Sequence, residues 1–150
     1  MIRDFMKEAP SVQEGLEGYQ KNFLEGKVFS GPFADYSLSF WEHKDDDNVL
    51  LIYYEDMKKD HEGHVRRIGR FLGRELTDEQ VEGIVAHTTF DAMKKNDAVS
   101  YKRYTDNTSI SFINKGQVGN WVSKFTPEMS ERYDREIADK CAAKGLVWKY

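Results

Sequence analysis

The sequence predicts an α/β protein in which helices predominate and one strand is buried. The segment "VLLIYYEDM" contains a continuous apolar run from Val49 to Tyr54. A strand covered on both faces is apolar throughout rather than alternating, and such strands are typical of parallel sheets. In most other segments, apolar residues recur at helical spacing. Since one strand cannot make a sheet, we expect partner strands outside this stretch of chain.

The bulk composition restricts the possible partners. The chain has 150 residues, enough for one domain, and a formal net charge of -4. No global positive field exists to attract nucleic acid or an acidic membrane, so any bound anion needs a local site. A single cysteine, Cys141, excludes an intramolecular disulfide and a cysteine-based zinc site. The N-terminus lacks the apolar core of a signal peptide, which favours a cytoplasmic protein.

Helical spacing predicts two helices before the strand. The first lies in "SVQEGLEGYQKNFLEGK", where Ser11 and Glu14 have the spacing of a capping box. The second follows a turn at "GP". The apolar residues of these helices are Val12, Leu16, Tyr19 and Phe23 in the first, and Phe33, Tyr36, Phe40 and Trp41 in the second.

The chain after the strand is predicted to be largely helical, for roughly six helices in all. Gly73 can end a helix in "HEGHVRRIGRFLG", and Thr77 with Gln80 predicts a capping box for the next. "TTFDAMKKN" predicts a short helix, and residues 97–111 a long loop. Thr126 as N-cap and Pro127 as first residue open the last helix. Its inward stripe is Met129, Tyr133, Ile137 and Cys141.

The histidines are weak candidates for acid–base or metal chemistry. His43, His61 and His64 lie among charged residues, which is typical of solvated surface positions. His87 is at a predicted helix end, where capping or packing is the ordinary role. His61 and His64 share a helix face, but no third ligand accompanies them, so a metal site is not expected.

Other polar residues follow the buried strand or lie near glycines. Tyr54 ends the strand, where open α/β sheets place ligand-binding loops, and Asp56 is interpreted as a cap of the next helix. By periodicity alone, Thr88 is a cap and Phe90 a core residue. In "NKGQVGN", Lys115 and the adjacent glycine backbone fit either an anion site or a tight structural turn.

Three ordered segments together resemble the second half of a cytosolic sulfotransferase. They are "FLEGKVFSGPFADYSLSFWEHKDDDNVLLIYYEDMKKD", "IGRFLGRELTDEQVEGIVAHTTFDAMKKN" and "FINKGQVGNWVSKFTPEMSERYD". The resemblance implies a three-layer, P-loop-kinase-like α/β fold, of which residues 1–150 would be the C-terminal portion. It also implies an enzyme that transfers a sulfuryl group from 3′-phosphoadenylyl sulfate (PAPS; product PAP) to an alcohol, phenol or amine, without a metal.

The resemblance assigns cofactor-binding roles to six positions. Tyr54 matches a tyrosine that contacts the adenine, Thr88 a threonine that hydrogen-bonds it, and Phe90 an aromatic packed near the base. Asn114, Lys115 and Gly116 match an Arg-Lys-Gly triplet at the 3′-phosphate. Because Asn114 replaces the arginine, a charge-assisted pair worth about 1.5–3 kcal/mol is lost.

Other family features have no counterpart in these residues. The phosphosulfate loop and the histidine that takes the acceptor's proton are absent, so no catalytic residue is assigned and the chain alone is expected to be inactive. The dimer motif keeps Thr126 and Glu131 but has Val122 and Pro127 at its lysine and valine places, which argues against that homodimer. The alternative is a truncated, non-catalytic nucleotide-binding or helical interaction protein.

Overall fold

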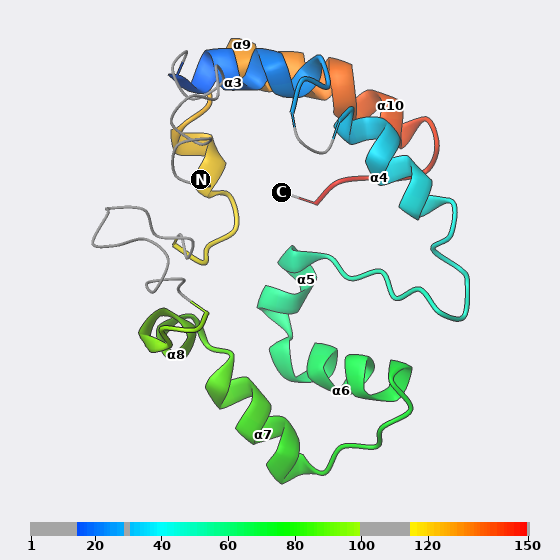
Figure 1. Cartoon of the computed structure of the whole chain (residues 1–150), viewed down its shortest axis with the longest axis vertical. Helices are drawn as coiled ribbons and strands as arrows, with labels where there is room; N and C mark the ends of the chain where they lie inside the picture. The colour runs from blue at the N-terminus through cyan, green and yellow to red at the C-terminus, as the bar shows by residue number, and fades with distance from the viewer. Residues whose placement is uncertain (1–14, 29–30, 100–114, 150) are drawn as a thin grey trace. The chain divides into compact units, whose positions relative to one another are not determined.

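The computed structural model describes residues 15–28, 31–99 and 115–149, and every regular element within these ranges is a helix (Figure 1). The chain divides into two compact units, Met1–Val49 with Trp121–Lys149, and Leu50–Asn120. The mostly helical character is as predicted, but the strand at 49–54 is not formed. Residues 49–53 run without regular pairing, and Tyr54 already begins a helix. A strand needs a hydrogen-bonded neighbour, and the described residues offer none.

In the first unit, the last helix packs against the first two. Gln20 is buried in α3, and its Nε2 donates to the carbonyl oxygen of Met129 in α9 at 2.6 Å. Figure 1 shows α3 and α9 side by side. The elements are α3 (Gly15–Leu24), α4 (Phe33–Trp41), η2 (Asn120–Ser123), α9 (Pro127–Tyr133), the π-helical turn η3 (Asp134–Ala138) and α10 (Asp139–Ala142).

The core of this unit combines the predicted C-terminal stripe with aromatic rings. Its buried residues are Ala34, Ile137, Cys141 and Leu146. Ring centroids of Phe23 and Phe33 lie 5.1 Å apart, and those of Phe33 and Trp148 5.6 Å apart. The predicted stripe is confirmed, since Met129 is also buried.

The ends of these helices test the predicted caps. Met129 N donates to Thr126 Oγ1 at 3.2 Å, which confirms that cap.

Tyr36 and Phe40 belong to the exposed side of α4, so only part of the apolar set predicted for that helix is buried. Ser11, Val12, Glu14 and most of the 97–111 segment lie outside the described residues.

The second unit is a succession of four helices among the described residues: α5 (Tyr54–Lys59), α6 (His61–Phe71), α7 (Asp78–His87) and α8 (Phe90–Lys95). Gly73 follows α6 with φ +68°, as predicted for a helix end. Both hydrogen bonds of the predicted capping box form: Gln80 N donates to Thr77 Oγ1 and Thr77 N to Gln80 Oε1. Asp56 was wrongly predicted as a cap, because it lies inside α5 and Asp60 caps α6 instead.

Candidate functional site

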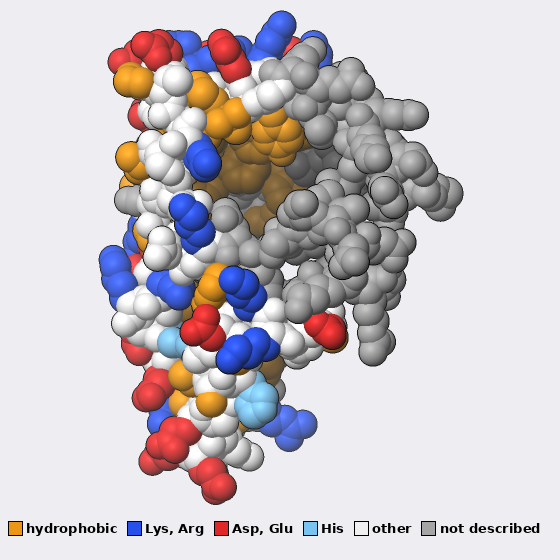
Figure 2. All heavy atoms as spheres, turned by 90° about the vertical axis from the view of Figure 1, so that its left-hand side faces the viewer, with side chains coloured by type: hydrophobic (Ala, Val, Ile, Leu, Met, Phe, Trp, Pro, Cys, Tyr) orange, Lys and Arg blue, Asp and Glu red, His pale blue; other side chains and the backbone are white. Residues whose placement is uncertain are grey.

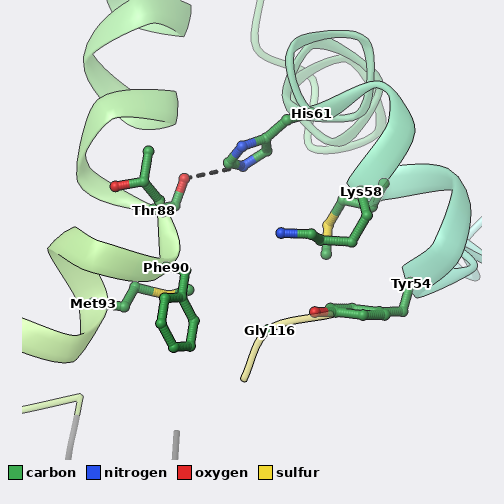
Figure 3. Close-up of a pocket in the computed structure, with 9 residues that line it drawn as sticks. Tyr54, Lys58, His61, Thr88, Phe90, Met93 and Gly116 are labelled. Atoms are coloured by element: carbon green, nitrogen blue, oxygen red, sulfur yellow. Dashed lines mark hydrogen bonds between the residues drawn. The ribbon is translucent and has the colours of Figure 1, made fainter. Parts of the chain in front are cut away.

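A pocket of about 210 Å³ lies within the second unit (Figure 3). Four segments of the sequence meet there: α5, the start of α6, the α7–α8 junction and the backbone at Gly116. This volume is below the usual size of a site for a whole drug-sized ligand, so it suits one part of a larger molecule. The lining residues are Tyr54, Met57, Lys58, His61, Thr88, Thr89, Phe90, Met93 and Gly116.

Two aromatic rings give the pocket flat apolar walls. Tyr54 is the first residue of α5, and the residue is 43% exposed. Phe90 is the first residue of α8, a helix whose start is fixed by Ala92 N donating to Thr89 Oγ1 at 3.2 Å. Figure 3 shows both side chains directed into the space between α5 and α8. Such rings can stack on a flat heterocycle.

Gly116 brings backbone directly against the Phe90 ring. Its φ of +63° is a conformation that favours glycine. A Cβ at this position would lie only 2.5 Å from Phe90 Cδ2, well inside van der Waals contact. Lys115, the preceding residue, is exposed, and Asn114 lies outside the described residues. Glycine is therefore required here both by the backbone conformation and by the close approach.

The polar groups of the pocket come from two helix junctions. Thr88 is the C-cap residue of α7; its Oγ1 donates to the carbonyl of Ile84 at 2.7 Å and contacts His61 Nε2 at 3.1 Å. Lys58 lies one helical turn after Tyr54, and its amine points into the pocket in Figure 3. Within the described part of the chain, this ammonium has no hydrogen bond or ion pair. The pocket thus offers an ammonium, hydroxyls and an imidazole beside its rings.

This one pocket is lined by four of the six residues assigned from the sequence, namely Tyr54, Thr88, Phe90 and Gly116. The sequence interpretation did not single out Lys58, and it placed His61 on the surface; in the structure both line the pocket, and His61 is half-buried. Lys58 had a usable signal, because a helix places residues four apart on one face with Tyr54. His61 had none, since its contact with Thr88 joins positions 27 residues apart.

The described residues offer no metal centre and no membrane-spanning helix. They contain no cluster of three or more His, Cys, Asp or Glu side chains able to hold a metal ion. In the same ranges, no helix has the length and apolar character needed to cross a membrane. Figure 2 shows acidic and basic side chains interspersed over one face. Because the formal net charge is -4, an anionic ligand is expected to be held by local groups rather than by a broad basic surface.

Comparison with known proteins identifies relatives over most of the chain. The model of a family described as "Sulfotransferase domain" matches residues 3–145. The chain is 38% identical over 126 residues to an amine sulfotransferase of Oryctolagus cuniculus, covering 80% of this chain and 42% of that protein. It is 34% identical over 135 residues to sulfotransferase 1B1 of Canis lupus familiaris, covering 87% and 46%.

Solved structures also resemble this chain over most of its length. A retinol dehydratase in complex with retinol and PAP superposes with a TM-score of 0.80 at 30% identity, covering 89% of this chain and 40% of that one. Mouse SULT7A1 complexed with PAP superposes with a TM-score of 0.73 at 34% identity, covering 87% and 48%. The chain therefore spans less than half the length of each of these relatives.

Proposed function

The chain belongs to the sulfotransferase family, and from this premise we propose that its pocket binds the adenosine and 3′-phosphate side of PAPS. One observation carries the proposal: residues from three separate stretches of sequence, each assigned to the nucleotide by resemblance, line a single pocket. The resemblance depends on short sequence segments alone and not on where these residues lie in space. Their convergence supports a common ligand over separate structural roles.

The chemistry of the pocket fits a purine nucleotide. Tyr54 and Phe90 provide surfaces for stacking a base, an interaction worth about 1–3 kcal/mol. Thr88 provides a hydroxyl to its edge. Lys58 and the exposed Lys115 provide cations for phosphate, and the backbone at Gly116 can approach a ligand closely because no Cβ intervenes. The contribution of Lys115 follows from its place beside Gly116 in the sequence.

We further propose the family reaction for the protein to which these residues contribute. PAPS, when bound, supplies the sulfuryl group, and the acceptor is a hydroxyl or amine of a small molecule. Solved relatives bound to PAP with retinol or androsterone are consistent with a small apolar acceptor. The residues described above bind and orient the nucleotide, and none is assigned to proton transfer. The chain alone is accordingly proposed to bind PAP without catalysing transfer. It is further proposed to be cytoplasmic and not to form a homodimer through the surface that the family uses.

Calorimetric titration of the 150-residue chain with PAP tests the nucleotide site. Lys115→Gln should weaken PAP binding roughly ten- to hundredfold, as expected for one charge-assisted contact to phosphate. Lys124→Gln is the matched control, since it removes the same charge from an exposed position that does not line the pocket. Adenosine, which lacks the phosphates, should bind both variants equally. If saturable PAP binding is absent, or both variants lose it equally, the proposed site is wrong.

A further inference from the structure

Each aromatic wall of the pocket has a methionine one helical turn further along the same helix. Met57 follows Tyr54 by three residues on α5, and both line the pocket. Met93 follows Phe90 by three residues on α8, and both of these also line it. Residues three apart share a helix face, and Figure 3 shows the Phe90 and Met93 side chains projecting together from α8. Two thioethers therefore complete the apolar lining beside the rings.

These two methionines are more open to solvent than the other sulfur-bearing residues that the structure describes. Met57 and Met93 are half-buried, whereas Met129 is buried in the first unit. Cys141 is fully buried, and burial raises the pKa of its thiol, which disfavours the reactive thiolate. Within the described ranges, the pocket thus holds the sulfur atoms that a dissolved oxidant reaches most readily.

We propose that Met57 and Met93 are oxidation sites through which a peroxide closes this pocket to nucleotides. A lone pair of the thioether sulfur attacks one peroxide oxygen, so that an S–O bond forms as the O–O bond breaks. The second oxygen takes the proton of the first and leaves as water. The sulfur is oxidised by two electrons to the sulfoxide, and the peroxide is reduced by two. This inference rests on the proposed function and extends it to the regulation of the same site.

A sulfoxide in the lining opposes the stacking of a base. It replaces apolar surface with a polar oxygen that water hydrates. A base that stacks on Tyr54 or Phe90 removes this water, and one acceptor left without a partner weakens binding roughly five- to hundredfold. If the Lys58 ammonium donates to the sulfoxide instead, its charge is no longer available to a phosphate of the ligand. Either arrangement lowers nucleotide affinity.

The experiment measures PAP binding to the full chain by calorimetry before and after treatment with hydrogen peroxide, and compares each variant with itself. Oxidation should weaken PAP binding to the wild-type chain roughly five- to hundredfold, and methionine sulfoxide reductases A and B together should restore it. The double variant Met57→Leu, Met93→Leu keeps apolar side chains of similar volume, and peroxide should change its affinity less than about twofold. Met129→Leu is the matched control and should lose affinity on oxidation as the wild type does. Met1 and Met6, which lie outside the described residues, are present in every variant.

Peptide mapping by mass spectrometry locates the oxidised sulfur atoms independently of calorimetry. Met57 and Met93 should gain oxygen at least a few-fold faster than Met129. Bound PAP should slow the oxidation of the two pocket methionines by a similar factor and leave the rate at Met129 unchanged.

The outcomes separate this inference from the proposed function. If the untreated wild-type chain binds no PAP, both are overturned. If PAP binding survives oxidation of Met57 and Met93, or the double variant loses affinity as the wild type does, the inference alone is overturned. The same holds if the oxidised wild-type chain loses its thermal unfolding transition, because the fold rather than the pocket has then failed. Should the double variant bind no PAP before treatment, the wild-type peptide map decides: protection of Met57 and Met93 by PAP supports the inference, and its absence overturns it.

Discussion

Alanine at position 116 should displace the Phe90 ring and weaken nucleotide binding more than it weakens the fold. Gly116 has φ +63°, and a Cβ there would lie 2.5 Å from Phe90 Cδ2. Carbon atoms in favourable contact are about 3.5–4.0 Å apart, so ring or backbone must move by roughly 1 Å. The ring is the part that can yield, because Phe90 is only partly buried at the start of a short helix.

Gly119 separates the two effects of this substitution. Its φ is +75°, yet a Cβ there would meet no atom within 4 Å. Both alanine variants should therefore share the conformational cost of a left-handed backbone, about 1–2 kcal/mol. Only Gly116→Ala adds the overlap with Phe90. In the free protein the partly buried ring can move aside at little cost, whereas a base stacked on Phe90 requires the ring in its original place. The usual overpacking cost of about 1–3 kcal/mol should therefore appear in nucleotide binding rather than in unfolding. That difference corresponds to roughly five- to hundredfold in a binding constant.

Urea unfolding and calorimetric titration with PAP measure the two effects independently. The free energy of unfolding should fall by a similar amount in both variants, while PAP affinity should fall only in Gly116→Ala. In a Phe90→Ala background, Gly116→Ala should weaken PAP binding no more than Gly119→Ala does, because the overlapping ring is gone. Equal losses of PAP affinity in the two single variants would refute the contact with Phe90 as the cause.

Three further predictions concern the fold. Thr77→Ala removes the cap of α7 and should lower the free energy of unfolding by about 1 kcal/mol in urea titration, whereas a change below a few tenths would contradict the capping box. Ile137→Ala, at 3% exposure, should cost about 2–5 kcal/mol in the same assay, and Val147→Ala, at 61% exposure, should be nearly neutral; similar costs for the two would contradict the described core. Burial raises the pKa of the Cys141 thiol above its ordinary 9.0. The unfolded chain then loses this proton first as pH rises, so stability present at neutral pH should decline above about pH 9, with a shallower decline in Cys141→Ala; identical pH slopes would contradict the shift.

Local signals in the sequence were sufficient to predict most helix ends and the inward-facing stripe of the last helix. The Thr77 and Thr126 caps depend on residues three apart, so their pattern is complete within a few positions. The stripe ending at Cys141 was readable because one helix supplies it. The apolar run at 49–54 was misjudged as a formed strand, because pairing depends on neighbours that a single segment cannot reveal.

The pocket was predictable in part. Tyr54, Thr88, Phe90 and Gly116 came from resemblance of short segments, and the structure brings them together. His61 was not predictable, since its contact with Thr88 arises only from the approach of α6 to α7. Composition around a histidine reports its sequence neighbours, whereas its hydrogen-bond partner is decided by tertiary packing.

Because of the π-helical turn η3, the last helix can lose one residue at that turn and still bury the same face. Met129, Tyr133, Ile137 and Cys141 are spaced by four residues throughout. In an uninterrupted α-helix such spacing drifts by about 40° per step. A π turn accommodates one residue more than the α-helical turn it replaces, so between Tyr133 and Ile137 the helix advances as though by three residues. A related sequence can therefore lose one residue in that turn and keep Cys141 buried, whereas a deletion between Ile137 and Cys141 would rotate the thiol by about 100° toward solvent.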